Sequence, residues 1–134
     1  MFDKFFPDRY VASTYVIDFE GLYKEGVRGL IFDIDNTLVP HGAPADERAR
    51  ALFKRLKSIG FRCCLISNNQ KPRVEMFNKD IQVDYVYNAH KPSIRNYLKA
   101  MEIMGTDRDS TVFIGDRFLP MCGEQNVPGS RIFW

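Results

Sequence analysis

The sequence has few cysteines and histidines, the residues that form disulfides or bind metals through sulfur and nitrogen. Among 134 residues there are three cysteines and two histidines. Cys63 and Cys64 are adjacent in an apolar run, and Cys122 lies far away along the chain. An odd number of cysteines, two of them in a predicted core strand, argues against a disulfide framework and is typical of a reducing cytoplasm. Without a CxxC motif or a Cys/His cluster, a sulfur-ligated metal is not expected.

A long hydrophobic run and an excess of one charge are also missing. No apolar run approaches the roughly 18–20 residues that span a bilayer, and residues 1–4 do not begin a secretory signal. Nineteen basic and seventeen acidic residues give a net charge of +2, which is too balanced to predict binding to nucleic acid. We therefore expect a cytoplasmic protein without a transmembrane segment. The length predicts a single domain over residues 1–134, with a lead-in over residues 1–28.

The chain does contain a regular alternation of predicted strands and helices. Apolar strands are predicted at 30–32, 61–66, 83–86, 111–114 and 130–134. Helices are predicted at 46–58, 72–79 and 93–104, and a short one at 16–23 with Asp18 as a possible N-cap. This order predicts an α/β fold, a Rossmann-like three-layer sandwich around a parallel sheet of about five strands. One helix and one strand fill each interval between the polar motifs described below, so no inserted cap domain is expected.

Polar residues stand where several of these strands end. They are Asp33, Asp35, Ser67, Asn68, Lys91 and Asp116. Ligands bind at the carboxyl edge of an open parallel sheet, so we expect these side chains to converge there. Carboxylate oxygens suit Mg²⁺, which also takes phosphate oxygens as ligands, and a carboxylate can attack phosphorus. The residues therefore predict a phosphate site with a divalent cation.

The order of these motifs resembles that of the haloacid dehalogenase superfamily of phosphatases. The matching segments are IFDIDNTL at 31–38, LISNN at 65–69, HKP at 90–92 and FIGD at 113–116. Shorter details, which are DNTLV, SNN, AxKP and the opening FPDRYV, resemble subfamily IIIA, the YqeG-like and phosphatidylglycerophosphate phosphatase group. The motifs cover most of the chain, from about residue 29 to residue 116.

The resemblance assigns a role to each residue. It implies that Asp33 is the nucleophile and Asp35 the acid and base, and that Thr37 orients the first loop. Asp33, the Asp35 carbonyl and Asp116 would hold Mg²⁺. Phosphate would be bound by Ser67, Asn68 and Lys91, with Lys91 also neutralising charge in the transition state. Each of these residues, taken singly, could instead have a purely structural role. Asp116, Ser67 and Asn68 could be helix caps, and Lys91 could be a solvent-exposed lysine.

The absence of a cap predicts an open site that suits a bulky or surface-bound phosphate ester. A lipid phosphate monoester and a phosphoprotein both fit, and the resemblance favours phosphatidylglycerophosphate at the inner membrane face. The aromatic residues among positions 1–10 either pack on the domain or form an edge that touches a membrane.

The fourth motif departs from the family pattern. The resemblance places a second acid five residues after Asp116, but Met121 stands there and cannot ligate Mg²⁺. This difference favours an alternative function, a catalytically impaired phosphate-binding or interaction protein. A one-base loss near Phe118, compensated by a gain near Gln125, would account for it by hiding the family's Thr-Asp. We also expect a truncated C-terminus, because relatives usually continue past the fifth strand. A phosphotransferase is a third possibility.

Overall fold

The five strands form one parallel sheet with the predicted catalytic strand at its centre. The structure is a computed structural model that describes residues 14–35, 37–87, 94–115 and 131–133. The strands are β1 (Gly29–Asp33), β2 (Arg62–Ile66), β3 (Asp84–Val86), β4 (Thr111–Ile114) and β5 (Arg131–Phe133). Their order across the sheet is β3-β2-β1-β4-β5, and every pairing is parallel. The predicted α/β class and strand number are confirmed.

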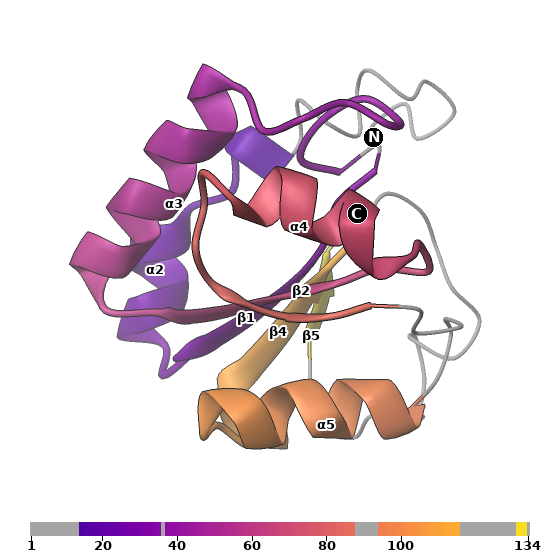
Figure 1. Cartoon of the computed structure of the whole chain (residues 1–134). Helices are drawn as coiled ribbons and strands as arrows, with labels where there is room; N and C mark the ends of the chain where they lie inside the picture. The colour runs from indigo at the N-terminus through magenta and orange to yellow at the C-terminus, as the bar shows by residue number, and fades with distance from the viewer. Residues whose placement is uncertain (1–13, 36, 88–93, 116–130, 134) are drawn as a thin grey trace.

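Helices cover both faces of this sheet (Figure 1). They are α2 (Phe19–Lys24), α3 (Glu47–Ile59), α4 (Lys71–Asn78) and α5 (Ile94–Met104), and a 3-10 turn, η1, spans Arg108–Ser110. On one face, Leu30 and Phe32 of β1 lie in a core with buried residues of α2, α3 and α4. On the other face, Ile31 of β1 lies in a second core with residues of α5. Alternate residues of one strand thus serve opposite layers, which gives the predicted three-layer sandwich.

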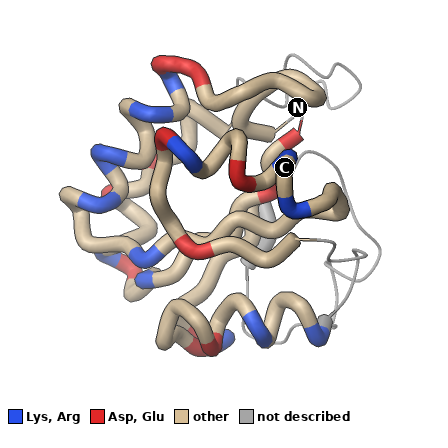
Figure 2. The backbone as a smooth tube through the Cα atoms, viewed as in Figure 1, with Lys and Arg blue, Asp and Glu red and all other residues tan. Residues whose placement is uncertain are grey.

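Local signals set the bounds of the long helix α3. The Asp46 carboxylate accepts a hydrogen bond from the Ala49 amide at 2.8 Å, which satisfies a free donor of the first turn. Gly60 ends the helix with φ of +120°, and a Cβ there would lie 2.8 Å from the Tyr23 hydroxyl oxygen. Lysines and arginines occupy exposed positions along α3 (Figure 2), opposite its buried Leu52. The helix is therefore amphipathic, as its sequence predicts.

The short helix α2 begins later than the sequence predicts. Asp18 is its N-cap, because the side chain accepts from the Gly21 amide at 3.0 Å. The first helical residue is therefore Phe19, and Val16 lies outside the helix with 79% of its surface exposed. A capping residue has non-helical backbone angles, so the helix cannot extend back through it.

The strand register places the polar motifs at one level. Asp33, the last residue of β1, is paired with Ile66, the last residue of β2. Phe32 is paired with Ile114 of β4. Ser67 thus follows directly beside Asp33, at the carboxyl edge. Between β1 and β2 the described chain holds α3 alone, and between β2 and β3 it holds α4 alone, so neither interval contains a cap domain. No helix among the described residues is long and apolar enough to cross a bilayer.

Candidate active site

A tight turn follows the central strand and brings two carboxylates to the sheet edge. The Ile34 carbonyl accepts from the amides of Thr37, Leu38 and Val39, at 3.3, 3.0 and 3.4 Å. Ile34 is fully buried, whereas Asp33 and Asp35 on either side of it are partly exposed. The apolar residue therefore anchors the turn and leaves the two aspartates on the accessible side.

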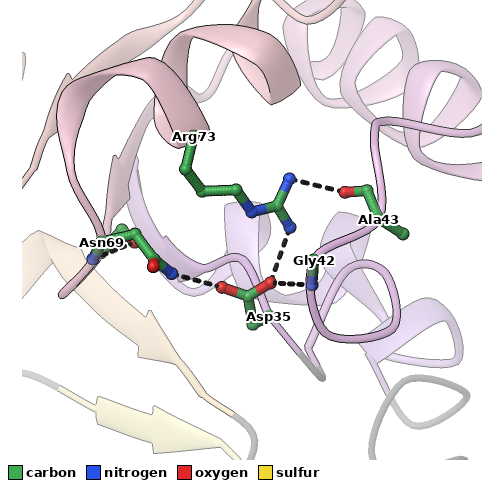
Figure 3. Close-up of polar contacts among 6 residues, drawn as sticks. Asp35, Gly42, Ala43, Asn69 and Arg73 are labelled. Atoms are coloured by element: carbon green, nitrogen blue, oxygen red, sulfur yellow. Dashed lines mark hydrogen bonds and ion pairs between the residues drawn. The ribbon is translucent and has the colours of Figure 1, made fainter.

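Three hydrogen-bond donors from two loops and one helix surround the Asp35 carboxylate (Figure 3). Its Oδ1 accepts from the Gly42 amide at 2.7 Å and from Arg73 Nη2 at 2.6 Å. Its Oδ2 accepts from Asn69 Nδ2 at 2.9 Å. The Asp35 and Arg73 side chains are only 14% and 12% exposed, so water screens this ion pair weakly.

These contacts change the acidity of Asp35. Burial acts to raise the pKa of this carboxyl, because it disfavours the charged form. The hydrogen bond from Arg73, the Gly42 N–H and the positive charges of Arg73 and His41 together outweigh burial and hold the pKa below its ordinary value. Asp35 is therefore ionised at neutral pH in this arrangement.

The residues after β2 form a second turn at the same edge. Ser67 is 2% exposed, its amide donates to the Val86 carbonyl at 3.0 Å, and its Oγ accepts from the Asn69 amide at 3.0 Å. The N-cap position of α4 belongs to Gln70, so the interpretation of Ser67 and Asn68 as caps of that helix is wrong. The hydroxyl instead fixes the turn that presents Asn69 to Asp35.

The structure places four of the predicted site residues at one edge of the sheet: Asp33, Asp35, Ser67 and Asn68. Thr37 lies in the first turn; it is fully buried, and its Oγ1 has no hydrogen-bond partner among the described residues. Lys91, Asp116 and Met121 fall outside the described residues, and so do positions 1–10. The roles assigned to the predicted site residues remain predictions.

Sequence reasoning missed Asn69 and Arg73 as partners of Asp35. Asn69 lies in the segment LISNN, but the sequence predicts no role for its side chain. Arg73 is one of 19 lysines and arginines in the chain. The contact with Asp35 spans 38 residues of sequence, so no local pattern marks it.

The oxygen donors at this edge fit a hard divalent cation. Asp33 ends β1 with a partly exposed carboxylate, and the backbone carbonyl of Asp35 follows two residues later. Oxygen donors of this kind suit Mg²⁺, which retains water ligands and so needs few protein groups. Within the described part of the chain, no three His, Cys, Asp or Glu residues gather closely enough to form a metal site by themselves.

Comparison with known proteins identifies the class. The haloacid dehalogenase-like hydrolase family matches residues 41–118, which is more than half of the chain. The chain is 35% identical over 121 residues to "Probable phosphatase YqeG" of Bacillus subtilis, covering 89% of this chain and 70% of that protein. The chain therefore belongs to the haloacid dehalogenase-like hydrolase family.

A solved structure supports the fold independently. A hypothetical protein of Xanthomonas campestris superposes with a TM-score of 0.58 over 87% of this chain and 70% of that chain, at 18% sequence identity. The family match begins at residue 41, after Asp33 and Asp35. The match to the family model is therefore independent of these two aspartates.

Proposed function

We propose that this protein is a Mg²⁺-dependent phosphomonoester hydrolase that works through an aspartyl-phosphate on Asp33. The observation that carries the proposal is the position of Asp33 at the carboxyl end of the central strand, paired with the residue that precedes Ser67. A phosphatase is also the activity named for the Bacillus subtilis relative.

The chemistry divides into two displacements. An Asp33 carboxylate oxygen attacks phosphorus while the bond to the leaving oxygen breaks, and Asp35 donates a proton to that oxygen. Asp35 then takes a proton from water, whose oxygen attacks phosphorus and releases phosphate and free Asp33. Ser67 and Lys91 hold phosphoryl oxygens during both steps. When bound, Mg²⁺ would be held by Asp33, the Asp35 carbonyl and Asp116, and it would offset the negative charge of the phosphoryl group.

The contacts of Asp35 indicate which oxygen carries the proton. A carboxylate oxygen has two lone pairs, and those of Oδ1 are both engaged by Gly42 and Arg73. Oδ2 accepts only from Asn69 among the described residues, so one of its lone pairs can take a proton. We assign proton transfer to Oδ2. A phosphate dianion beside Asp35 favours the protonated form, since like charges raise a carboxyl pKa.

The substrate belongs to a class that an uncapped edge admits. Each interval between the first three strands holds one helix, so the leaving group of an ester bound at Asp33 extends toward solvent. A lipid phosphate monoester at a membrane surface suits this access, and phosphatidylglycerophosphate is the first candidate. The protein would then work in the cytoplasm and bind the inner membrane face peripherally.

Phosphate release with Mg²⁺ tests the proposal. The panel contains phosphatidylglycerophosphate in detergent micelles, a phosphopeptide and a small aryl phosphate. Asp33→Asn should abolish release, because the amide cannot form the aspartyl-phosphate, whereas Arg55→Met on the surface of α3 should not change it. Release by Asp33→Asn at the wild-type rate would refute the nucleophile, and a preference for the small ester would refute the lipid substrate.

A second candidate function rests on Met121. A methionine at the position where the family pattern has a second acid favours a phosphate-binding or interaction protein that turns over slowly or not at all. Met121→Asp separates the two candidates, because it restores the acid that the family pattern has at this position, and a carboxylate could serve as a Mg²⁺ ligand. An inert wild type with an active Met121→Asp variant would establish the impaired protein, and resequencing of the gene would show whether Pro120-Met121-Cys122 is encoded.

A further inference from the structure

We propose that Arg73 is a positioning residue, which sets the orientation of the Asp35 carboxylate and fastens the loop 40–43 beside it. The proposal rests on the proposed function, because Asp35 is the proton donor and acceptor of that reaction. Arg73 acts through Asp35 and is not placed on the reacting atoms.

One guanidinium group joins the carboxylate to the loop. Arg73 Nη2 donates to Asp35 Oδ1 at 2.6 Å, and Nη1 donates to the Ala43 carbonyl at 2.7 Å. The Gly42 amide of the same loop also donates to Oδ1, at 2.7 Å. Figure 3 shows the resulting closed ring, in which the start of α4, the loop and Asp35 hold one another. A planar fork with two donors fixes direction as well as distance.

Burial distinguishes this contact from the arginine pairs of the surface. The Arg73 and Asp35 side chains are 12% and 14% exposed. In the ion pair between Arg55 and Glu20 the side chains are 45% and 52% exposed. Removing a long polar side chain from water is costly unless its partners are well placed. A largely buried guanidinium whose two terminal nitrogens donate to Asp35 and to the loop is therefore a specific feature of the site.

The carboxylate is held from two directions. Asn69 Nδ2 donates to Oδ2 at 2.9 Å, and Figure 3 shows Asn69 beside this oxygen, whereas Arg73 and Gly42 contact Oδ1. Together the donors fix the plane of the carboxyl group and the direction of the Oδ2 lone pair that remains. Loss of Arg73 would leave Oδ1 with the Gly42 amide alone and free the carboxylate to turn. A displacement of about 1 Å in a catalytic group costs roughly 100-fold in rate.

Leaving groups of different basicity separate positioning from a general structural role. An alkyl alcohol is a poor leaving group and needs a proton as the bond breaks, whereas nitrophenolate leaves without one. Arg73→Met should therefore lower kcat/KM, which reports formation of the aspartyl-phosphate and not its later hydrolysis, by roughly 100-fold on an alkyl phosphate and by less than about 3-fold on nitrophenyl phosphate. Arg73→Lys should lie between wild type and Arg73→Met, because one ammonium cannot reach Asp35 and Ala43 with the geometry of a fork.

The experiment compares wild type, Arg73→Met, Arg73→Lys and the matched surface variant Arg55→Met on both esters with Mg²⁺. A leaving-group-dependent loss confined to the Arg73 variants supports the proposal. An equal loss on both esters, or no loss, overturns it.

Failure of the proposed function is recognised separately, by wild type and Asp33→Asn releasing phosphate at equal rates. Hydrogen exchange then decides whether Arg73 holds the loop. If the Gly42 amide exchanges faster in Arg73→Met than in Arg55→Met, the proposal that Arg73 holds the loop stands. If its exchange is unchanged, that proposal is overturned.

Discussion

Replacing Arg73 with methionine should destabilise the folded protein by about 2–3 kcal/mol. Loss of one partner of a buried ion pair commonly costs about 3–5 kcal/mol, because the other charge is left without compensation. Here Asp35 keeps its bonds from Gly42 and Asn69, so the expected cost lies below that range. Methionine retains most of the aliphatic volume, so the change removes charge and hydrogen bonds more than packing.

A double-mutant cycle isolates the interaction between the two side chains. Asp35→Asn, Arg73→Met and the double variant are unfolded in urea with EDTA present, so that no bound metal adds to stability. We expect a coupling free energy of about 1.5–3 kcal/mol, the range for a hydrogen bond to a charged group. The stability lost by the double variant should therefore be smaller than the sum of the losses of the two single variants by this coupling free energy.

The pair formed by Glu20 and Arg55 provides the control cycle. Its side chains are about half exposed, at 52% and 45%, so solvent screens it and its coupling should be smaller. High salt should weaken the control pair more than the pair of Asp35 and Arg73. A coupling for Asp35 and Arg73 no larger than that of the control pair would refute the argument that burial makes this contact strong.

Three further measurements test other parts of the structure. Asp46→Ala should lower the free energy of unfolding by about 1 kcal/mol in a urea titration, because it removes the side-chain cap of α3; an unchanged midpoint would contradict this. Burial raises the pKa of Cys63 and of Cys64 to about 12, so in a Cys122→Ser background both thiols should react with a disulfide reagent at pH 8 about 1,000-fold more slowly than in urea, and equal rates would show that they are accessible. The pKa of Asp35 lies below its ordinary value of 3.8, so this group contributes stability above that pH and loses it as pH falls through the lower folded value; the stability gap between wild type and Asp35→Asn without metal should close in acid, and a gap that is constant with pH would refute the shift.

Most of the fold follows from local signals in the sequence. The alternation of apolar strands with amphipathic helices predicts the α/β class, and the cap at Asp46 and the stop at Gly60 predict α3 to within one residue at either end. The sequence predicts the start of α2 too early, because the apolar pattern extends back to Val16, whereas the N-cap is Asp18. Pattern detects where apolar residues recur, whereas capping geometry decides where the helix begins.

The sequence predicts the motif residues of the site, but it does not predict the residues that hold them in place. Asp33, Asp35 and Ser67 stand at strand ends, where parallel topology brings them to one edge. Arg73 stands in the first turn of α4, and nothing in the local sequence distinguishes it from a surface arginine. Arg73 contacts Asp35 because the first turn of α4 packs beside the loop after β1. The two residues are 38 positions apart in the sequence.

By itself the sequence determined the class of fold, the order of the motifs and the chemical kinds of group at the sheet edge. These depend on periodicity, caps and strand ends, which are local properties. Only the tertiary structure decided that the Asp35 carboxylate is held by Arg73, Gly42 and Asn69, and that its pKa is lowered. The physical reason is that acidity and orientation depend on burial and on donors from distant segments, which meet only when the sheet edge is assembled.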